Sequence, residues 1–154
     1  MPREAVPALA PPPGPEAGSF TPPPWGDLVR PAFHADAVEH RFVAGSMGTP
    51  GAATDWIRLR VPVVAGESPS PLQRVAAAAD FGNGVSWVLP RTDGWQFINP
   101  DLTVYLHRTL VGEWVCLEAV TWPGPEGVGM AESRLWDQNG VVGRSVQSLL
   151  LARG

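Results

Sequence analysis

The sequence predicts an α+β domain in which a long antiparallel sheet curls around one buried helix. Segments that alternate apolar and polar residues are typical of half-buried strands. One central stretch, residues 71–81, contains four consecutive alanines and favours a helix. Glycine-rich turns separate the later segments. Because that single helix is mostly Ala, Val and Leu, it has to be buried against a face of the sheet.

Length and composition limit the class of protein. The chain has 154 residues, a formal net charge of −4, and 11 arginines without a lysine, which suits one domain with a substantial core. The absence of basic clusters argues against a nucleic-acid partner. No apolar run reaches the roughly 18 residues that cross a bilayer, and no secretion signal is evident, so a cytoplasmic protein is expected.

The single cysteine, Cys116, excludes an internal disulfide framework and cannot build a zinc site alone. It stands at an alternating position of "EWVCLEAV", which predicts a buried apolar side chain. We expect no metal and no cofactor.

Proline usage divides the chain in two. Ten of the 18 prolines fall within the first 31 residues, where they remove backbone donors and fix φ. Residues 1–32 are therefore predicted to form an extended leader or linker that makes no sheet, with Trp25 either pinned to the domain or loosely packed. Residues 33–154 form the predicted domain.

The elements of the domain follow the order β-β-α-β-β-β-β. Ser70 and Pro71 form a favourable helix start, and Gly82 and Gly84 are expected to end the helix. "DQNG" is a strong hairpin signal. The predicted strands are 34–45, 53–64, 95–111, 112–124, 127–140 and 141–154.

Three stretches together carry a resemblance to a known family. They are "AAAADFGNGVS" (76–86), "INPDLTVYLHR" (98–108) and "DQNGVVGRSVQSLLLAR" (137–153). In this order and spacing, residues 34–152 resemble the second hotdog module of the TesB-like (type II) acyl-CoA thioesterases. The resemblance implies a hotdog fold and a substrate that is an acyl group on CoA or on a carrier protein.

The resemblance also implies a catalytic set. In that family an aspartate, a threonine or similar polar residue, and a glutamine orient the water that attacks the thioester. The matching positions here are Asp80, Asn99 and Gln147, with asparagine in place of the more common threonine. A carboxylate at a helix C-terminus, partly shielded from water, suits a base that takes a proton from that water.

Arginines that could bind the CoA phosphates are Arg91, Arg108 and Arg153.

Other interpretations of the same residues stay open. Asp80 alone is also typical of a solvent-facing helix end, Gln147 of an exposed strand position, and Asn99 before proline of a turn. His107 is predicted to be a half-buried strand histidine, and His34 and His40 to be surface or rim residues.

Two rival functions follow from the same fold. A non-catalytic acyl-binding or scaffold module is compatible with the change to Asn99. A hotdog hydratase would show a motif like D-x-N-P-x-H, and "INPDLTVYLHR" lacks its aspartate and its histidine.

The family's chains usually hold two hotdog modules, whereas this sequence contains one after a proline-rich stretch. A lone module would leave a sheet edge and an apolar flank exposed. We therefore expect a homodimer, or pairing with another hotdog module.

Overall fold

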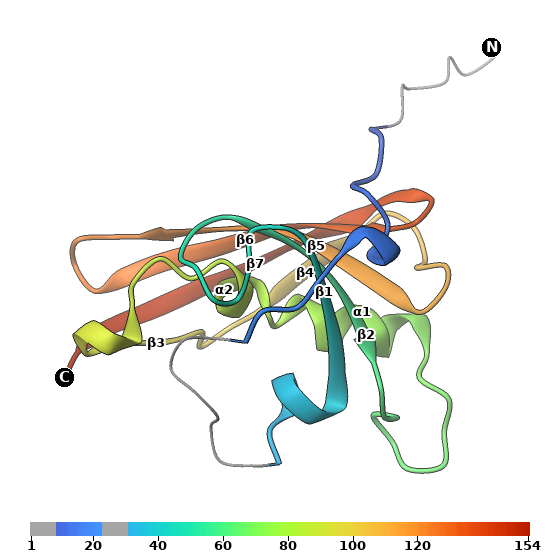
Figure 1. The fold of residues 1–154 in the computed structure, drawn as a ribbon, viewed down its shortest axis with the longest axis horizontal. Coiled ribbons are helices and arrows are strands. Elements are labelled where there is room, and N and C mark those ends of the chain that lie inside the picture. Colours follow the sequence, from blue (N-terminus) through green and yellow to red (C-terminus); the bar gives the residue numbers. More distant parts are fainter. Residues whose placement is uncertain (1–8, 23–30) are drawn as a thin grey trace.

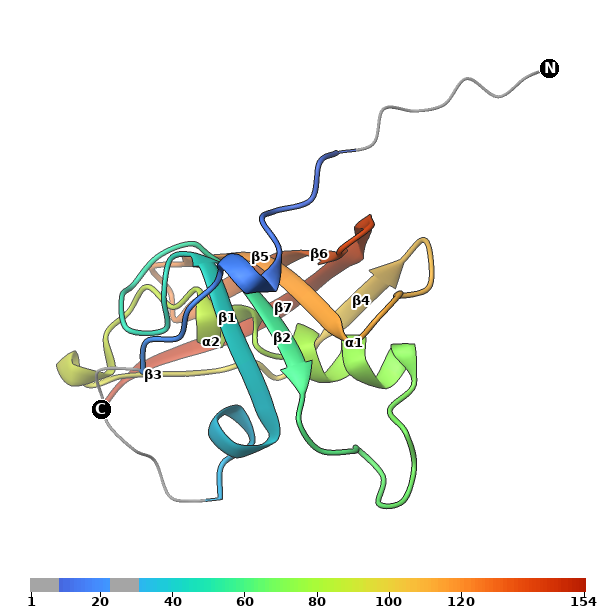
Figure 2. The same ribbon diagram turned by 45° about the vertical axis from the view of Figure 1, so that its right-hand side comes forward.

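The computed structural model describes residues 9–22 and 31–154, so Trp25 lies outside the described residues. Seven antiparallel strands form one sheet in the order β1-β2-β5-β6-β7-β3, and β4 also pairs with β7. Figures 1 and 2 show the α-helices on one side of this sheet. The strands are β1 (Val38–Ala44), β2 (Ala53–Leu59), β3 (Trp95–Ile98), β4 (Thr103–Leu106), β5 (Trp114–Pro123), β6 (Val128–Asp137) and β7 (Gly140–Arg153).

The central helix is α1 (Pro71–Ala79). Ser70 caps it by accepting from the Gln73 amide at 3.2 Å, and the Gln73 side chain accepts from the Ser70 amide at 2.7 Å. This reciprocal pair is a capping box, which satisfies two backbone donors that a helix start leaves open. The helix buries Val75, Ala78 and Ala79 against the sheet.

The helix ends earlier than predicted, and the chain stays helical afterwards. Asp80 is the C-cap of α1, and a second short helix, α2 (Gly82–Val85), follows after Phe81. The two glycines are therefore part of a helical turn and do not terminate one. Neither has a positive φ, so the left-handed C-cap on which the prediction rested is absent at both positions.

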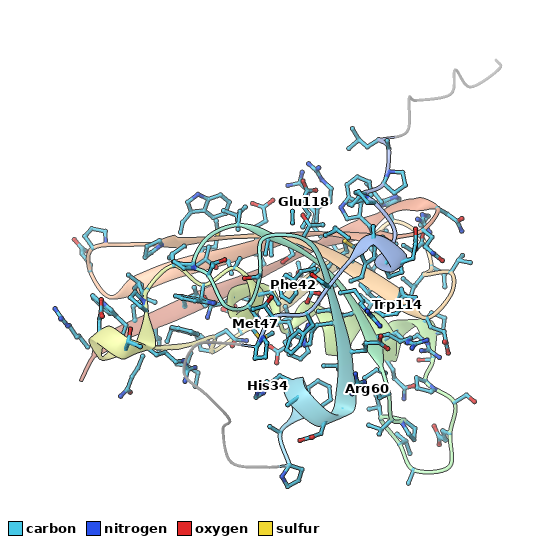
Figure 3. The ribbon with its side chains drawn as sticks, viewed as in Figure 1. His34, Phe42, Met47, Arg60, Trp114 and Glu118 are labelled. Atoms are coloured by element: carbon cyan, nitrogen blue, oxygen red, sulfur yellow. The ribbon has the colours of Figure 1, made fainter. Side chains whose placement is uncertain are left out.

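The main core lies between the helices and the inner face of the sheet. Phe42, Met47 and Leu117 belong to it, whereas Glu118 is exposed on the opposite face (Figure 3). A smaller cluster on that outer face contains Trp56, Cys116 and Trp136. The prediction that Cys116 is buried is confirmed, and burial raises the pKa of its thiol.

The leader packs on the domain over part of its length. Pro15 is buried in a short helical turn, and the Trp56 Nε1–H donates to the Pro13 carbonyl at 2.7 Å. Ser19 forms an antiparallel bridge with Phe42. This isolated bridge lies outside the named strands, and the described part of the leader contributes no strand to the sheet. The domain boundary at residue 32 stays a prediction.

Three predicted strands differ from the structure, and the predicted strand 53–64 ends at Leu59. Residues 33–37 form one π-helical turn, and β1 begins only at Val38. The predicted strand 95–111 is two short strands, because Pro100 has no amide to donate to a ladder and the chain leaves the sheet between Ile98 and Thr103. The "DQNG" hairpin is confirmed: it joins β6 to β7, and the Asp137 carboxylate accepts from the Asn139 amide.

Candidate active site

Three separate elements bring the predicted site residues together. Asp80 lies at the end of α1, Asn99 directly after β3, and Gln147 in the middle of β7. Gln147 pairs with Ala131 of β6, and its side chain points to the helix side of the sheet, where it reaches the start of α2. The structure therefore places all three polar side chains at the junction between the two helices.

One carboxylate oxygen of Asp80 is held by two amides. The Asn99 Nδ2–H donates to Asp80 Oδ1 at 2.8 Å, and the Gln147 Nε2–H donates to the same oxygen at 3.3 Å. The Gln147 Nε2–H also donates to the Asp80 carbonyl at 2.9 Å. These contacts fix both the backbone and the carboxylate of the residue that ends α1.

Gln147 itself is fully buried, with 1% of its surface exposed. Its Oε1 accepts from the Asn83 amide at 3.0 Å, so both ends of the side-chain amide are bonded to the helix junction. The absence of a side chain at Gly82 makes this approach possible: a Cβ there would lie 2.9 Å from Gln147 Oε1 and 3.1 Å from Ser133 Oγ. The alternative of an exposed strand glutamine is wrong.

The second carboxylate oxygen of Asp80 is available for other partners. Within residues 9–22 and 31–154, no group donates to Oδ2. Asp80 is exposed, so the described residues do not provide the expected shielding from water. The reason is its place at the helix end, beyond the sheet that covers Ala78 and Ala79.

A polar cluster that no sequence motif predicted lies under α2. The Ser86 hydroxyl donates to the Gly82 carbonyl at 2.8 Å and lies 2.8 Å from the Thr121 hydroxyl. Thr121 in turn reaches Asn83 Oδ1 at 3.5 Å. All three side chains are buried. Asn83 and Ser86 lie inside the quoted 76–86 motif, but no spacing rule links them to Thr121, thirty-five residues later than Ser86.

The histidine predictions are partly wrong. His40 is buried, and its Nδ1 is hydrogen-bonded to a carboxyl oxygen of the buried Asp55 at 2.5 Å. It is buried because rings of Phe20 and Phe42 stack on it and Phe81 meets it edge-on. Burial raises the pKa of the Asp55 carboxyl, although the hydrogen bond with His40 acts to lower it. His107 is exposed after the end of β4, where the predicted strand has already stopped.

Arg108 is not available for CoA phosphates. Its guanidinium makes two hydrogen bonds of 2.6 Å to the buried Asp137 carboxylate and others to the carbonyls of Val141 and Gly140. Arg153 donates to the Asp93 carbonyl and lies over the Trp95 ring. Arg91 lies over Phe97.

In the described part of the chain, no three His, Cys, Asp or Glu side chains are grouped so that they could hold a metal ion. No helix among those residues is both long and apolar enough to span a membrane.

Comparison with known proteins assigns the family. The model of the acyl-CoA thioesterase C-terminal domain matches residues 3–151, and the chain belongs to this family. A comparison with curated proteins found no match.

Solved structures share the fold at low sequence identity. The chain is similar to the acyl-CoA thioesterase II TesB2 of Mycobacterium marinum, with 16% identity, a TM-score of 0.66, and coverage of 98% of this chain and 58% of that one. It is also similar to a putative thioesterase of Novosphingobium aromaticivorans, with 24% identity and a TM-score of 0.62, over 96% of this chain and 57% of that one. A thioesterase family protein of Silicibacter pomeroyi shares 11% identity and a TM-score of 0.51 with this chain, over 81% of this chain and 91% of that one. The fold is thus the predicted α+β hotdog, and the chain spans less than three fifths of the first two structures.

Proposed function

We propose that this chain is an acyl-CoA thioesterase that hydrolyses a fatty acyl thioester by base-assisted attack of water. The observation that carries the proposal is the exposed Asp80, whose carboxylate two amides hold by one oxygen, while no described residue donates to the other. Membership of the acyl-CoA thioesterase C-terminal domain family supports the substrate class.

The proposed reaction needs no covalent enzyme intermediate. Asp80 Oδ2 takes a proton from water as the water oxygen attacks the thioester carbonyl. Asn99 and Gln147 hold Oδ1, so that Oδ2, and with it the water, has one orientation. Collapse of the tetrahedral intermediate then breaks the carbon–sulfur bond, Asp80 returns its proton to the leaving thiolate, and CoA thiol and the free acid are released.

The substrate carbonyl has room beside Gly84. A Cβ at Gly84 would meet nothing within 4 Å. Gly84 lies in the first turn of α2, where amides have no carbonyl partner within their own helix. An amide in this turn suits the developing oxyanion, which needs donors fixed in advance.

A second hotdog unit, from another copy of this chain or a separate protein, is proposed to complete the site. Asp80 is exposed in the single chain, whereas hydrolytic sites gain from exclusion of bulk water. The proposed acyl-CoA or acyl-carrier substrate would then lie near the seam between the two units. The cytoplasm is the proposed location.

Thiol release tests this function. The wild type and Asp80→Asn are compared on butyryl- to stearoyl-CoA, with Glu126→Gln as a control because Glu126 is an exposed carboxylate in the β5–β6 turn. Removing the base is expected to slow turnover on the order of 100-fold, while the control keeps wild-type rates. Equal turnover by Asp80→Asn contradicts the role of Asp80. Acyl-CoA binding without turnover by the wild type supports the non-catalytic acyl-binding module instead.

A further inference from the structure

The edge of the sheet is interrupted beside Gln147. Strand β3 pairs with residues 150–153 of β7, and β4 pairs with residues 143–146. Neither strand pairs with residues 147–149. The chain crosses this gap through residues 99–102, so Asn99 has no ladder to hold it opposite Asp80.

Asp101 bridges the gap with its side chain. Its Oδ1 accepts from the Ser148 amide at 2.9 Å, and its Oδ2 accepts from the Ser148 hydroxyl. The first bond supplies the Ser148 amide with a partner that no strand provides. The second hydrogen bond uses the other carboxylate oxygen, so both oxygens of Asp101 accept from the same residue of β7.

The hydrogen bonds between Asp101 and Ser148 lie next to the candidate active site in the sequence. Ser148 follows Gln147 on β7, and Asn99 precedes Asp101 by two residues, with Pro100 fixing φ between them. Gln147 and Asn99 both donate to Asp80 Oδ1. Asp101 therefore ties the segment that carries Asn99 to the residue of β7 that follows Gln147.

We propose that Asp101 is a positioning residue that holds Asn99 against the Asp80 carboxylate through its two hydrogen bonds to Ser148. The role rests on the function proposed above, but the geometry does not depend on turnover. Hydrogen bonds from the Ser148 side chain and amide also keep the pKa of Asp101 below its usual range, so the acceptor form is present at neutral pH.

A double-mutant cycle tests the route through Asn99. Asp101→Ala is expected to lower kcat on the order of 10-fold or more, with KM little changed, because a misplaced polar group costs rate. In an Asn99→Ala background the same change should have almost no further effect. Asp101→Asn should restore most of the rate, because its amide can accept from the Ser148 amide and donate to the hydroxyl. Additive losses in the double variant would overturn the proposal.

Amide hydrogen exchange provides a readout that needs no activity. Asp101→Ala should speed exchange at Ser148 and in residues 99–102, while α1 and β5 keep wild-type protection. Asp93→Ala, an exposed aspartate before β3, serves as the matched control. Unchanged exchange in residues 99–102 would overturn the proposal even in an active enzyme. If the wild type hydrolyses no acyl-CoA, the proposed function fails, and faster exchange there still supports the positioning of Asn99 by Asp101.

Discussion

Gly82 and Gly84 lie in the same short helix but have different surroundings. A Cβ at Gly82 would crowd Gln147 Oε1 at 2.9 Å and Ser133 Oγ at 3.1 Å, whereas a Cβ at Gly84 would meet open space. We predict that Gly82→Ala displaces the Gln147 amide and lowers kcat for acyl-CoA hydrolysis on the order of 10-fold. Gly84→Ala is the matched control for stability, because alanine favours helix by about 1 kcal/mol over glycine.

Thermal melts and kinetics of both variants check this prediction. Gly84→Ala should keep or raise the melting temperature, and its effect on KM reports whether the thioester approaches there. If Gly82→Ala keeps wild-type turnover and a melting temperature no lower than that of Gly84→Ala, then Gln147 tolerates displacement and does not orient Asp80.

At the residue scale, sequence predicted which side chains meet but not how they are bonded. Motif order selected Asp80, Asn99 and Gln147, and the structure joins them by hydrogen bonds; their catalytic role stays a prediction. The bonds that Gln147 donates to the Asp80 carbonyl and that Ser148 donates to the Asp101 carboxylate lie where β3 and β4 leave β7 unpaired. No local pattern contains that information, and the same is true of the contact between His40 and Asp55.

At the element scale, the start of α1 is the most testable feature. The capping box of Ser70 and Gln73 provides acceptors for two backbone amides that would otherwise need water as a partner. Ser70→Ala should lower the free energy of unfolding by about 1 kcal/mol, measured by urea denaturation, with kcat unchanged because Ser70 is at the far end of the helix from Asp80. Ser68→Ala, in the exposed loop before it, is the control. An equal loss in both variants would assign the effect to the loop.

The β6–β7 hairpin predicts a dependence of stability on pH. Burial raises the pKa of Asp137, but hydrogen bonds from Arg108 and from the amides of Val111 and Asn139 outweigh it and hold the value below the usual range. A carboxyl with a lowered folded-state pKa stabilises the fold above its unfolded pKa of about 3.9. That contribution disappears as pH falls through the folded-state pKa. The wild type should therefore lose stability below about pH 4.

Urea denaturation across this pH range separates Asp137 from other carboxylates. Asp137→Asn should be about 3 kcal/mol less stable at neutral pH, because it leaves the partly buried Arg108 without its charge partner. It should also lose less stability on acidification than the wild type. Asp93→Asn, at an exposed position, should follow the wild-type curve. If the free energy of unfolding of Asp137→Asn falls with pH as steeply as that of the wild type, then other carboxylates cause the acid sensitivity.

Element boundaries show where sequence patterns fail. Alternation correctly indicated that residues 38–44 and 53–59 are strands. The outer-face residue Trp56 is nevertheless as buried as its neighbour Ile57, because the leader covers that face at Pro13. Likewise, periodicity continued through residues 99–102, although Pro100 and the Asp101 side chain take the chain out of the ladder there.

At the scale of the whole molecule, the exposed sheet edge predicts association. Among the described residues, strands β3 and β4 each pair only with β7, and Ile98, Tyr105 and Leu106 are 63%, 69% and 39% exposed along this edge. An open edge with apolar side chains is a template for pairing with another sheet. It adjoins Asn99, so a partner docked there would also limit the access of water to Asp80.

We therefore predict a dimer at micromolar concentration, with Tyr105→Asp shifting it toward monomer, since a charge on an edge strand opposes pairing. Sedimentation velocity measures the change. Val63→Asp, in the loop after β2 and 54% exposed, is the control for adding a charge to an apolar surface residue. If the site needs its partner, Tyr105→Asp should lose turnover in proportion to the monomer fraction and regain it at higher protein concentration. A wild-type monomer that hydrolyses acyl-CoA at full rate would contradict this, and would mean that Asp80 acts as a base while open to solvent.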